Sequence, residues 1–174
     1  MPNVARRWLV DSIGSRLVPA FGERAFKTVP IPDDGDRESK LAFPFGWLRR
    51  TSPNGFDQVE IQLATGTTPA FFVNFGCVPA AGTPDLWGDL IPPEKVWVHW
   101  LQRAHRLYDR PRALRPFAVR RWFWQPSPTP PDYEELVEDV VRLIPEVEDG
   151  LAGVRIGPHV RLTEAKWPLL KKSR

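Results

Sequence analysis

The stretch FDQVEIQLA, residues 56–64, decides the fold together with AFFVNFGCV, residues 70–78. In the first stretch apolar residues alternate with polar ones, which are Val59, Ile61 and Leu63 against Gln58, Glu60 and Gln62. A period of two residues predicts an antiparallel strand with one buried face. The second stretch is more apolar and is therefore expected nearer the centre of the sheet. The turn TGTTP at 65–69 joins the two stretches into a hairpin.

Further strands are predicted on both sides of this hairpin. GWLRRTS at 46–52 reaches it through the turn SPNG, and RAFKTVPI at 24–31 is expected as a short edge strand. FAVRRWFW at 117–124 concentrates aromatic and β-branched residues, which favour strands. Short turns between successive strands indicate a meander, and we expect a sheet of about four to six strands.

One helix is predicted at each end of the chain. Apolar residues recur at helical spacing from Val4 to Leu17, with Asn3 as the cap and Pro19 as the end. A second helix is expected from Asp132, which would cap it, to about Ile144. Helices packed on an antiparallel sheet define an α+β fold.

The chain, residues 1–174, is expected to form a single domain. Residues 32–40 and 125–131 are predicted loops, and residues 168–174 a flexible tail. The Pro- and Gly-rich stretch 79–95 is expected to be irregular. Residues 96–110 are compatible with either a helix or a strand.

Composition limits the classes of protein that fit. Of the 174 residues 42% are hydrophobic and 26% charged, as in ordinary globular domains, and the net charge is +3. Eight Trp and twenty Pro are the departures from the average. The single cysteine, Cys77, excludes an intramolecular disulfide, and no apolar run is long enough to span a membrane. We expect a soluble cytoplasmic protein without a membrane partner.

No motif of known catalytic chemistry occurs. His99 and His105 are six residues apart without nearby carboxylates, so we expect no metal, since such sites need three or four ligands. No glycine pattern suits a phosphate, and we expect no cofactor and no catalytic residue. An enzyme with an unfamiliar site made from His99, His105 and Cys77 is kept as an alternative.

A basic block with interleaved aromatic residues covers 96–124, with seven Arg against the single acid Asp109. Arg and exposed aromatic rings together can bind single-stranded nucleic acid, and the candidates here are Arg103, Arg106, Arg120 and Arg121. In 117–124, however, strand alternation gives each face mainly apolar residues and one Arg. That pattern favours a strand covered on both sides, with the arginine stems packed over Trp rings.

An acidic block follows, with eight acids against Arg142 alone over residues 132–149. On a helix, its acids would lie opposite the apolar stripe and could dock on a basic partner protein; the candidates are Glu134, Glu135, Glu138 and Asp139. Trp is the residue type most enriched in interface hot spots, and the candidate anchors are Trp87, Trp97 and Trp100.

Several short motifs occur in the order found in one bacterial family. They are the strand pair VEIQLA and FFVNFG with Asn74 and Gly76, the segment VHWLQRAHRLY, the WFW of 122–124 and the acidic closing helix. From about Val10 to Ile144 the chain resembles domain-of-unknown-function family 4304. The Pro-rich insert 79–93 and the tail after Gly150 depart from that pattern.

The resemblance implies an α+β bacterial cytoplasmic protein and assigns no activity. Small domains of this kind often lie near toxin and immunity genes, which favours protein binding. The leading hypothesis is therefore a non-enzymatic interaction domain, such as an immunity-type inhibitor. Single-stranded nucleic-acid binding is the second hypothesis.

Overall fold

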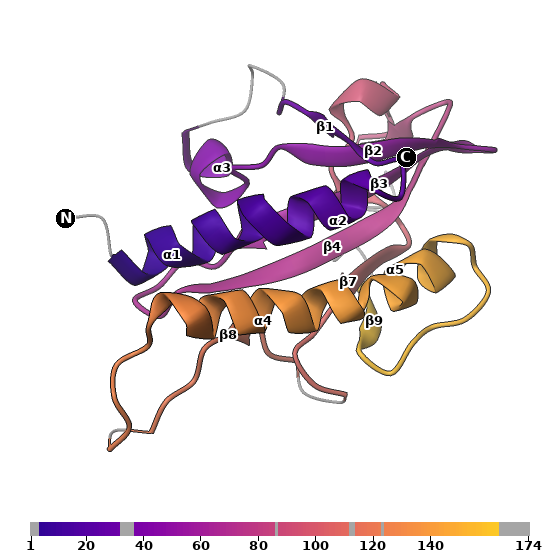
Figure 1. Cartoon of the computed structure of the whole chain (residues 1–174). Helices are drawn as coiled ribbons and strands as arrows, with labels where there is room; N and C mark the ends of the chain where they lie inside the picture. Colours follow the sequence, from indigo (N-terminus) through magenta and orange to yellow (C-terminus); the bar gives the residue numbers. More distant parts are fainter. Residues whose placement is uncertain (1–3, 32–36, 86, 112–113, 123, 164–174) are drawn as a thin grey trace.

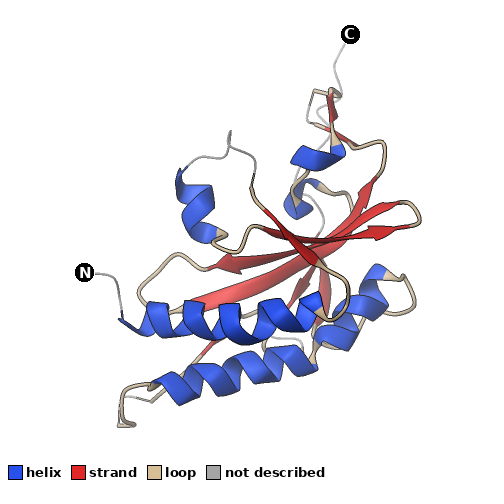
Figure 2. Ribbon diagram, turned by 45° about the horizontal axis from the view of Figure 1, so that its top comes forward, coloured by secondary structure: helices blue, strands red, loops and turns tan. Residues whose placement is uncertain are grey.

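An antiparallel sheet forms the centre of the computed structural model, and a layer of helices covers one of its faces (Figure 1 and Figure 2). The structure describes residues 4–31, 37–85, 87–111, 114–122 and 124–163. The predicted α+β fold is confirmed. Within the described residues the main sheet has seven strands, which extends the expected range of four to six.

The first four strands of the sheet form the predicted meander. The strands are β1 (Lys27–Val29), β2 (Trp47–Ser52), β3 (Gly55–Leu63), β4 (Ala70–Pro79), β7 (Ala104–Leu107), β8 (Phe117–Ala118) and β9 (Val160–Thr163). Their order is β1-β2-β3-β4-β7-β9, and β8 pairs with the start of β4. The hairpin expected from 56–64 and 70–78 is the longest ladder, running from Gly55 opposite Pro79 to Leu63 opposite Phe71.

The N-terminal helix is longer than predicted. It comprises α1 (Val4–Ser12), a π-helical turn η1 (Ile13–Leu17) and α2 (Val18–Gly22), and it buries the predicted stripe that includes Leu9, Ile13 and Leu17. The expectation that Pro19 ends this helix is wrong. Pro19 lies in the first turn of α2, directly after the π-helical turn η1, and the helix continues through it to Gly22.

The C-terminal helical region consists of α4 (Pro130–Arg142) and α5 (Ile144–Leu151). Thr129, and not Asp132, is the N-cap of α4. Asp132 instead completes a capping box, accepting from the backbone N–H and the hydroxyl of Thr129 at 2.7 and 2.8 Å. The predicted loop 125–131 therefore ends at Thr129, because Pro130 and Pro131 suit the first helical positions.

The two faces of the sheet are covered differently. The helices pack on the face that carries Val59, Ile61 and Phe75. The opposite face is covered near β2 and β3 by the short 3-10 helices η2 (Pro93–Lys95) and η3 (Val98–Trp100) and the segment 96–101. β3 is therefore not half-buried as predicted, since Gln58 and Glu60 on this second face are both 0% exposed.

Other local predictions need correction. The expected loop 32–40 contains the start of α3 (Arg37–Ala42), while residues 32–36 lie outside the described part of the chain. The irregular stretch 79–95 includes a small hairpin, β5 (Thr83–Pro84) and β6 (Leu90–Ile91). Residues 96–110 hold both a 3-10 helix and a strand. The predicted tail 168–174 also lies outside the described residues.

None of the helices in the described ranges combines the length and the apolar character needed to cross a membrane.

Candidate functional site

Two exposed tryptophans stand out in the loop that joins β8 to α4, whose described residues 119–122 and 124–129 extend away from the body of the molecule (Figure 1). The Trp122 and Trp124 side chains are 66% and 65% exposed. Their rings are parallel within 4°, with centroids 5.2 Å apart. Two stacked aromatic rings attract each other by more than the burial of their apolar area alone provides. We call these two residues the tryptophan pair and the loop the tryptophan loop.

The predicted strand 117–124 is wrong for residues 119–122 and 124, and with it the expectation of a strand covered on both faces; residue 123 lies outside the described part of the chain. Ala118 lies opposite Ala70, the first residue of β4. The next position on that side is Pro69, which has no N–H to donate to a ladder. The chain instead leaves the sheet, and a tight turn joins Trp122 to Gln125 by backbone and side-chain hydrogen bonds of 2.9 and 2.8 Å.

Both arginines that precede the tryptophan pair are held in ion pairs. Arg121 donates to Asp132, the residue that also completes the capping box of α4. Arg120 lies 3.3 Å from the Asp109 carboxylate and donates to the Pro116 carbonyl. The capping hydrogen bonds from Thr129, and then Arg121, lower the pKa of Asp132, so its charged form is favoured. The loop is thus fastened to α4 and to the segment after β7.

The four candidate acids of α4 divide into two pairs. Glu134 and Glu138 bind Arg16 of η1, at 2.5 and 2.7 Å, and these hydrogen bonds raise the pKa of the guanidinium. Glu135 and Asp139 are exposed, and Asp139 pairs with Arg142 at 2.6 Å. Half of the predicted acidic surface therefore joins α4 to the N-terminal helix.

The three candidate Trp anchors do not form one surface. Trp87 is 70% exposed in the β5–β6 hairpin. Trp97 is only 9% exposed and packs edge-on against Trp47, with ring centroids 5.1 Å apart. Trp100 is half-buried beside Trp97. Trp122 and Trp124, which are nearly as exposed as Trp87, were not among the candidates, because a strand covered on both faces was expected there.

The four candidate arginines for nucleic acid are not brought together either. Arg106 projects on the second face of the sheet, where it donates to Asn74 at 2.6 Å and lies over the Phe72 ring. Arg103 is exposed in the turn before β7. Arg120 and Arg121 lie in the tryptophan loop and are neutralised by their carboxylate partners. This distribution does not form a continuous cationic track for a phosphate backbone.

The three residues of the enzyme alternative do not converge: His105 and Cys77 lie on the helix-covered face of the neighbouring strands β7 and β4, and His99 lies over the opposite face. His105 faces the helices, stacked on Phe75 with centroids 5.2 Å apart, and burial lowers its pKa. His99 is exposed on η3, which covers the opposite face. Among the described residues no group of three or more His, Cys, Asp or Glu side chains is arranged to hold a metal ion.

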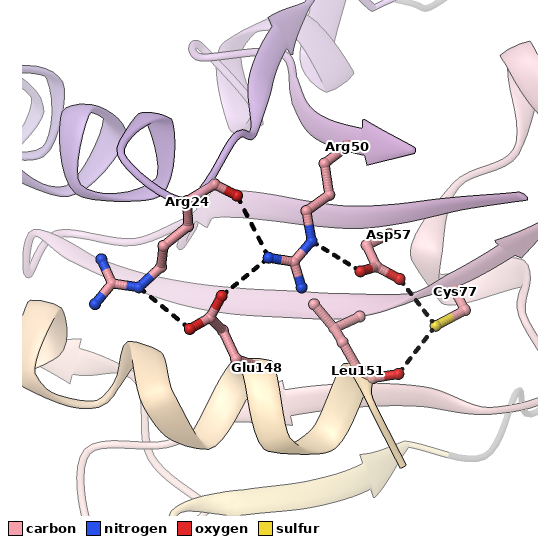
Figure 3. A network of polar contacts seen from close by, with 6 residues as sticks. All are labelled: Arg24, Arg50, Asp57, Cys77, Glu148 and Leu151. Carbon is pink, nitrogen blue, oxygen red and sulfur yellow. Dashed lines mark hydrogen bonds and ion pairs between the residues drawn. The ribbon is translucent and has the colours of Figure 1, made fainter. Parts of the chain in front are cut away.

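Cys77 belongs to a polar network that joins the sheet to the helices (Figure 3). Its sulfur lies 3.3 Å from an Asp57 carboxylate oxygen and 3.4 Å from the Leu151 carbonyl oxygen, which share its single S–H donor, and partial burial together with Asp57 raises its pKa to about 12. Arg50 bridges Asp57 and Glu148, each at 2.9 Å. A thiol with so high a pKa is a poor nucleophile at neutral pH, and the contacts of this network join β2, β3 and β4 to α5.

A second buried polar group holds the covering segment on the sheet. The Glu60 carboxylate accepts from Gln58 at 2.7 Å and from the Val98 N–H at 2.8 Å through one oxygen. Its other oxygen has no hydrogen-bond partner within the described ranges. Burial raises the pKa of Glu60 to about 7. Arg49 adds bonds to the Pro93 and Val96 carbonyls, so the segment 93–98 is tied to β2 and β3.

No family model, curated protein or solved structure matches the chain. The resemblance to domain-of-unknown-function family 4304 therefore stays a prediction. A proposal about function has to be based on the exposed tryptophan pair.

Proposed function

We propose that this chain is a non-enzymatic protein-interaction domain whose anchor is the tryptophan pair. One observation carries the proposal, namely that two stacked indoles are each about two thirds exposed in a loop that leaves the sheet. Trp dominates interface hot spots, because a rigid side chain buries a large apolar area and loses little conformational entropy.

The contacts that hold the tryptophan loop in place support the same function. Arg121 is bound to Asp132, and the turn at Gln125 holds the Trp122 backbone. An anchor whose orientation is fixed before binding loses less conformational freedom on association. The pair is therefore suited to enter an apolar recess of a partner.

An exposed acid of α4 also suits a basic partner. Glu135 is exposed on the helix into which the tryptophan loop leads, whereas Asp139, also exposed there, is paired with Arg142. Acidic residues beside an apolar anchor accelerate association with a basic partner. Reversing Glu135 to Lys should slow that association at low salt and have little effect at high salt.

An immunity-type inhibitor is one form of this function, and it is supported only by the family resemblance. The single cysteine fits a reducing compartment such as the cytoplasm.

Photo-crosslinking tests the proposal in the cells that make the chain. Benzoylphenylalanine replaces Trp122 in one variant and Val154 in another; Val154 is 73% exposed in a different loop and serves as the matched control. We expect a discrete protein adduct from position 122 that is absent from position 154. The same pattern at both positions, or no adduct at either, would contradict the proposal.

A further inference from the structure

A short segment closes part of the second face of the sheet, and we call its residues 93–101 the cover. Its Val96 and Val98 side chains are 0% exposed, and Leu101 is 4% exposed. They pack against Val78 of β4 and Ala104 of β7. Among the described residues, side chains of β2 and β3 bind the backbone of the cover at distances of 2.8 to 3.3 Å. A small buried polar cluster therefore holds the cover on the sheet.

Two polar atoms under the cover are buried without a hydrogen-bond partner in the described part of the chain. They are Oε2 of Glu60 and Nε1 of Trp47, on residues that lie directly opposite each other in the β2–β3 ladder. A buried polar atom without a partner costs free energy that the same atom in water does not. Lifting the cover removes this cost, so the cluster is the weak point of this face.

The Glu60 carboxyl group makes that cost depend on pH. Its two hydrogen bonds, from Gln58 at 2.7 Å and from the Val98 N–H at 2.8 Å, both end on Oε1. When the group is ionised, Oε2 carries negative charge in a side chain that is 0% exposed. Burial raises the pKa of Glu60 to about 7, although both hydrogen bonds act in the opposite direction. The closed cover therefore favours the protonated carboxyl group.

Within the described ranges, the neighbouring charges do not bind the Glu60 carboxyl group directly. Arg49 of β2 and Arg106 of β7 favour its ionised form from a distance, and their hydrogen bonds go to other acceptors. The charged or titratable side chains of the cover are exposed: Glu94, Lys95 and His99. Partial desolvation, and then Arg106, lower the pKa of His99, so His99 loses its charge at a lower pH than Glu60 gains one. Glu60 is thus the buried group whose charge changes near pH 7.

We propose that the cover is a pH-dependent gate on this face of the sheet. It lies closed while Glu60 holds its proton, and it opens locally when Glu60 loses the proton to solvent. Opening lets water reach both unpartnered atoms and exposes the Trp47 ring together with the apolar residues beneath the cover. The gate is separate from the tryptophan pair and does not depend on the proposed function.

The two pKa values of Glu60 set the size of the effect. In the open state the carboxyl group is hydrated and has its ordinary pKa of 4.5, whereas in the closed state the pKa is about 7. The preference for the closed state is therefore complete below pH 4.5 and is lost as pH rises through 7. Proton linkage between these values makes opening roughly tenfold more frequent at pH 8 than at pH 6.

Backbone amide exchange of the full chain, followed by NMR at pH 6 and pH 8, tests the gate. Each rate is divided by the rate of an unstructured peptide at the same pH, which gives a protection factor. The Val98 N–H should lose protection roughly tenfold between the two pH values. Local opening exposes little surface, so this exchange should be insensitive to about 1 M urea, whereas exchange at Val73 in the centre of β4 should accelerate.

Two variants separate Glu60 from the other carboxyl group of the cover. Glu60→Gln keeps an acceptor for the Val98 N–H and has no proton to lose, so its Val98 protection should be the same at both pH values. Glu94→Gln changes the exposed carboxyl group on the cover itself and should keep the wild-type loss of protection.

Equal Val98 protection at pH 6 and pH 8 in the wild type, or a loss that persists in Glu60→Gln, overturns the inference. A Val98 rate that rises with urea as steeply as that of Val73 also overturns it, because the whole domain would then be unfolding. If Val73 loses its protection in Glu60→Gln, that variant does not fold, and the wild type and Glu94→Gln decide. An unchanged Val98 protection in either of them contradicts the gate.

Discussion

Two groups of tryptophans in this molecule have opposite environments. Trp47 and Trp97 lie between β2 and the covering segment, 0% and 9% exposed, and their rings meet edge-on at 89°. Trp122 and Trp124 are about two thirds exposed, and their rings are stacked within 4°. The first group fills space under a segment that buried polar residues hold in place. The second group is held by ion pairs at the surface and leaves its outer area to solvent.

The difference shows that aromatic content alone does not identify a binding surface. What separates the two groups is whether another part of the same chain covers them. Residues 96–101 cover Trp47, because Gln58, Glu60 and Arg49 bind that segment through its backbone. The Trp122 and Trp124 side chains, in contrast, stay about two thirds exposed. Stability should therefore depend on the first group and binding on the second.

The largest expected effect is that of Trp47→Ala. Truncation of a fully buried Trp should lower the free energy of unfolding by about 3–5 kcal/mol, because it leaves a cavity in close-packed surroundings. The double change Trp122→Ala with Trp124→Ala should alter it by less than about 1 kcal/mol. Urea denaturation followed by far-UV circular dichroism measures both. Equal losses would mean that the tryptophan pair is also structural.

The next effect concerns Glu60, whose buried carboxyl group is next to the buried tryptophans, since Glu60 lies opposite Trp47 in the β2–β3 ladder. Its pKa rises from 4.5 in the unfolded chain to about 7 in the folded protein. Folding then takes up a proton between these values, so the stabilisation is complete below pH 4.5 and is lost as pH rises through 7. The loss from this group is at most about 3 kcal/mol.

Glu60→Gln removes this titration and keeps an acceptor for the Val98 N–H. The free energy of unfolding of the variant should change less between pH 5 and pH 8 than that of the wild type, which denaturation at the two pH values measures. Glu135→Gln, at an exposed position of α4, should leave the wild-type dependence intact. A Glu60→Gln variant with the full wild-type dependence would show that another group is responsible.

The alternation in residues 56–64 and the apolar stripes of the terminal helices were sufficient to predict the meander and its helical layer. These patterns are local, because apolar residues repeat at a fixed spacing along one face of a single helix or strand. β9 was not predicted, because its four residues become a strand only through pairing with β7, which is about fifty residues away in the sequence. Pairing between distant segments leaves little trace in a single short stretch.

The prediction of the candidate site was wrong for the same reason, because it depended on contacts between residues that are distant in the sequence. The tryptophan pair is exposed because β4 begins at Ala70, so that the partner of residue 119 would be Pro69. Nothing within 117–124 itself carries that information. Likewise, Glu60 reads as a solvent-facing strand residue until the segment 93–98 is known to cross it. The acids of α4 were placed on the correct element, but Arg16, which binds two of them, lies on the opposite terminal helix.

The smallest effect tests the bracing of the tryptophan pair through Asp132. Its pKa is lowered, so the contribution of its charge is present above its ordinary pKa of 3.8 and is lost as pH falls below it, the reverse of Glu60. Asp132→Ala should cost about 1 kcal/mol through the lost capping box. It should also weaken the exciton signal of the stacked indoles in circular dichroism, because Arg121 loses its partner. Asp139→Ala, which removes the exposed Arg142 pair of the same helix, should leave that signal unchanged. An unaltered exciton signal in Asp132→Ala would mean that the indoles hold their own stack without the ion pair, and that the anchor is ordered by its rings alone.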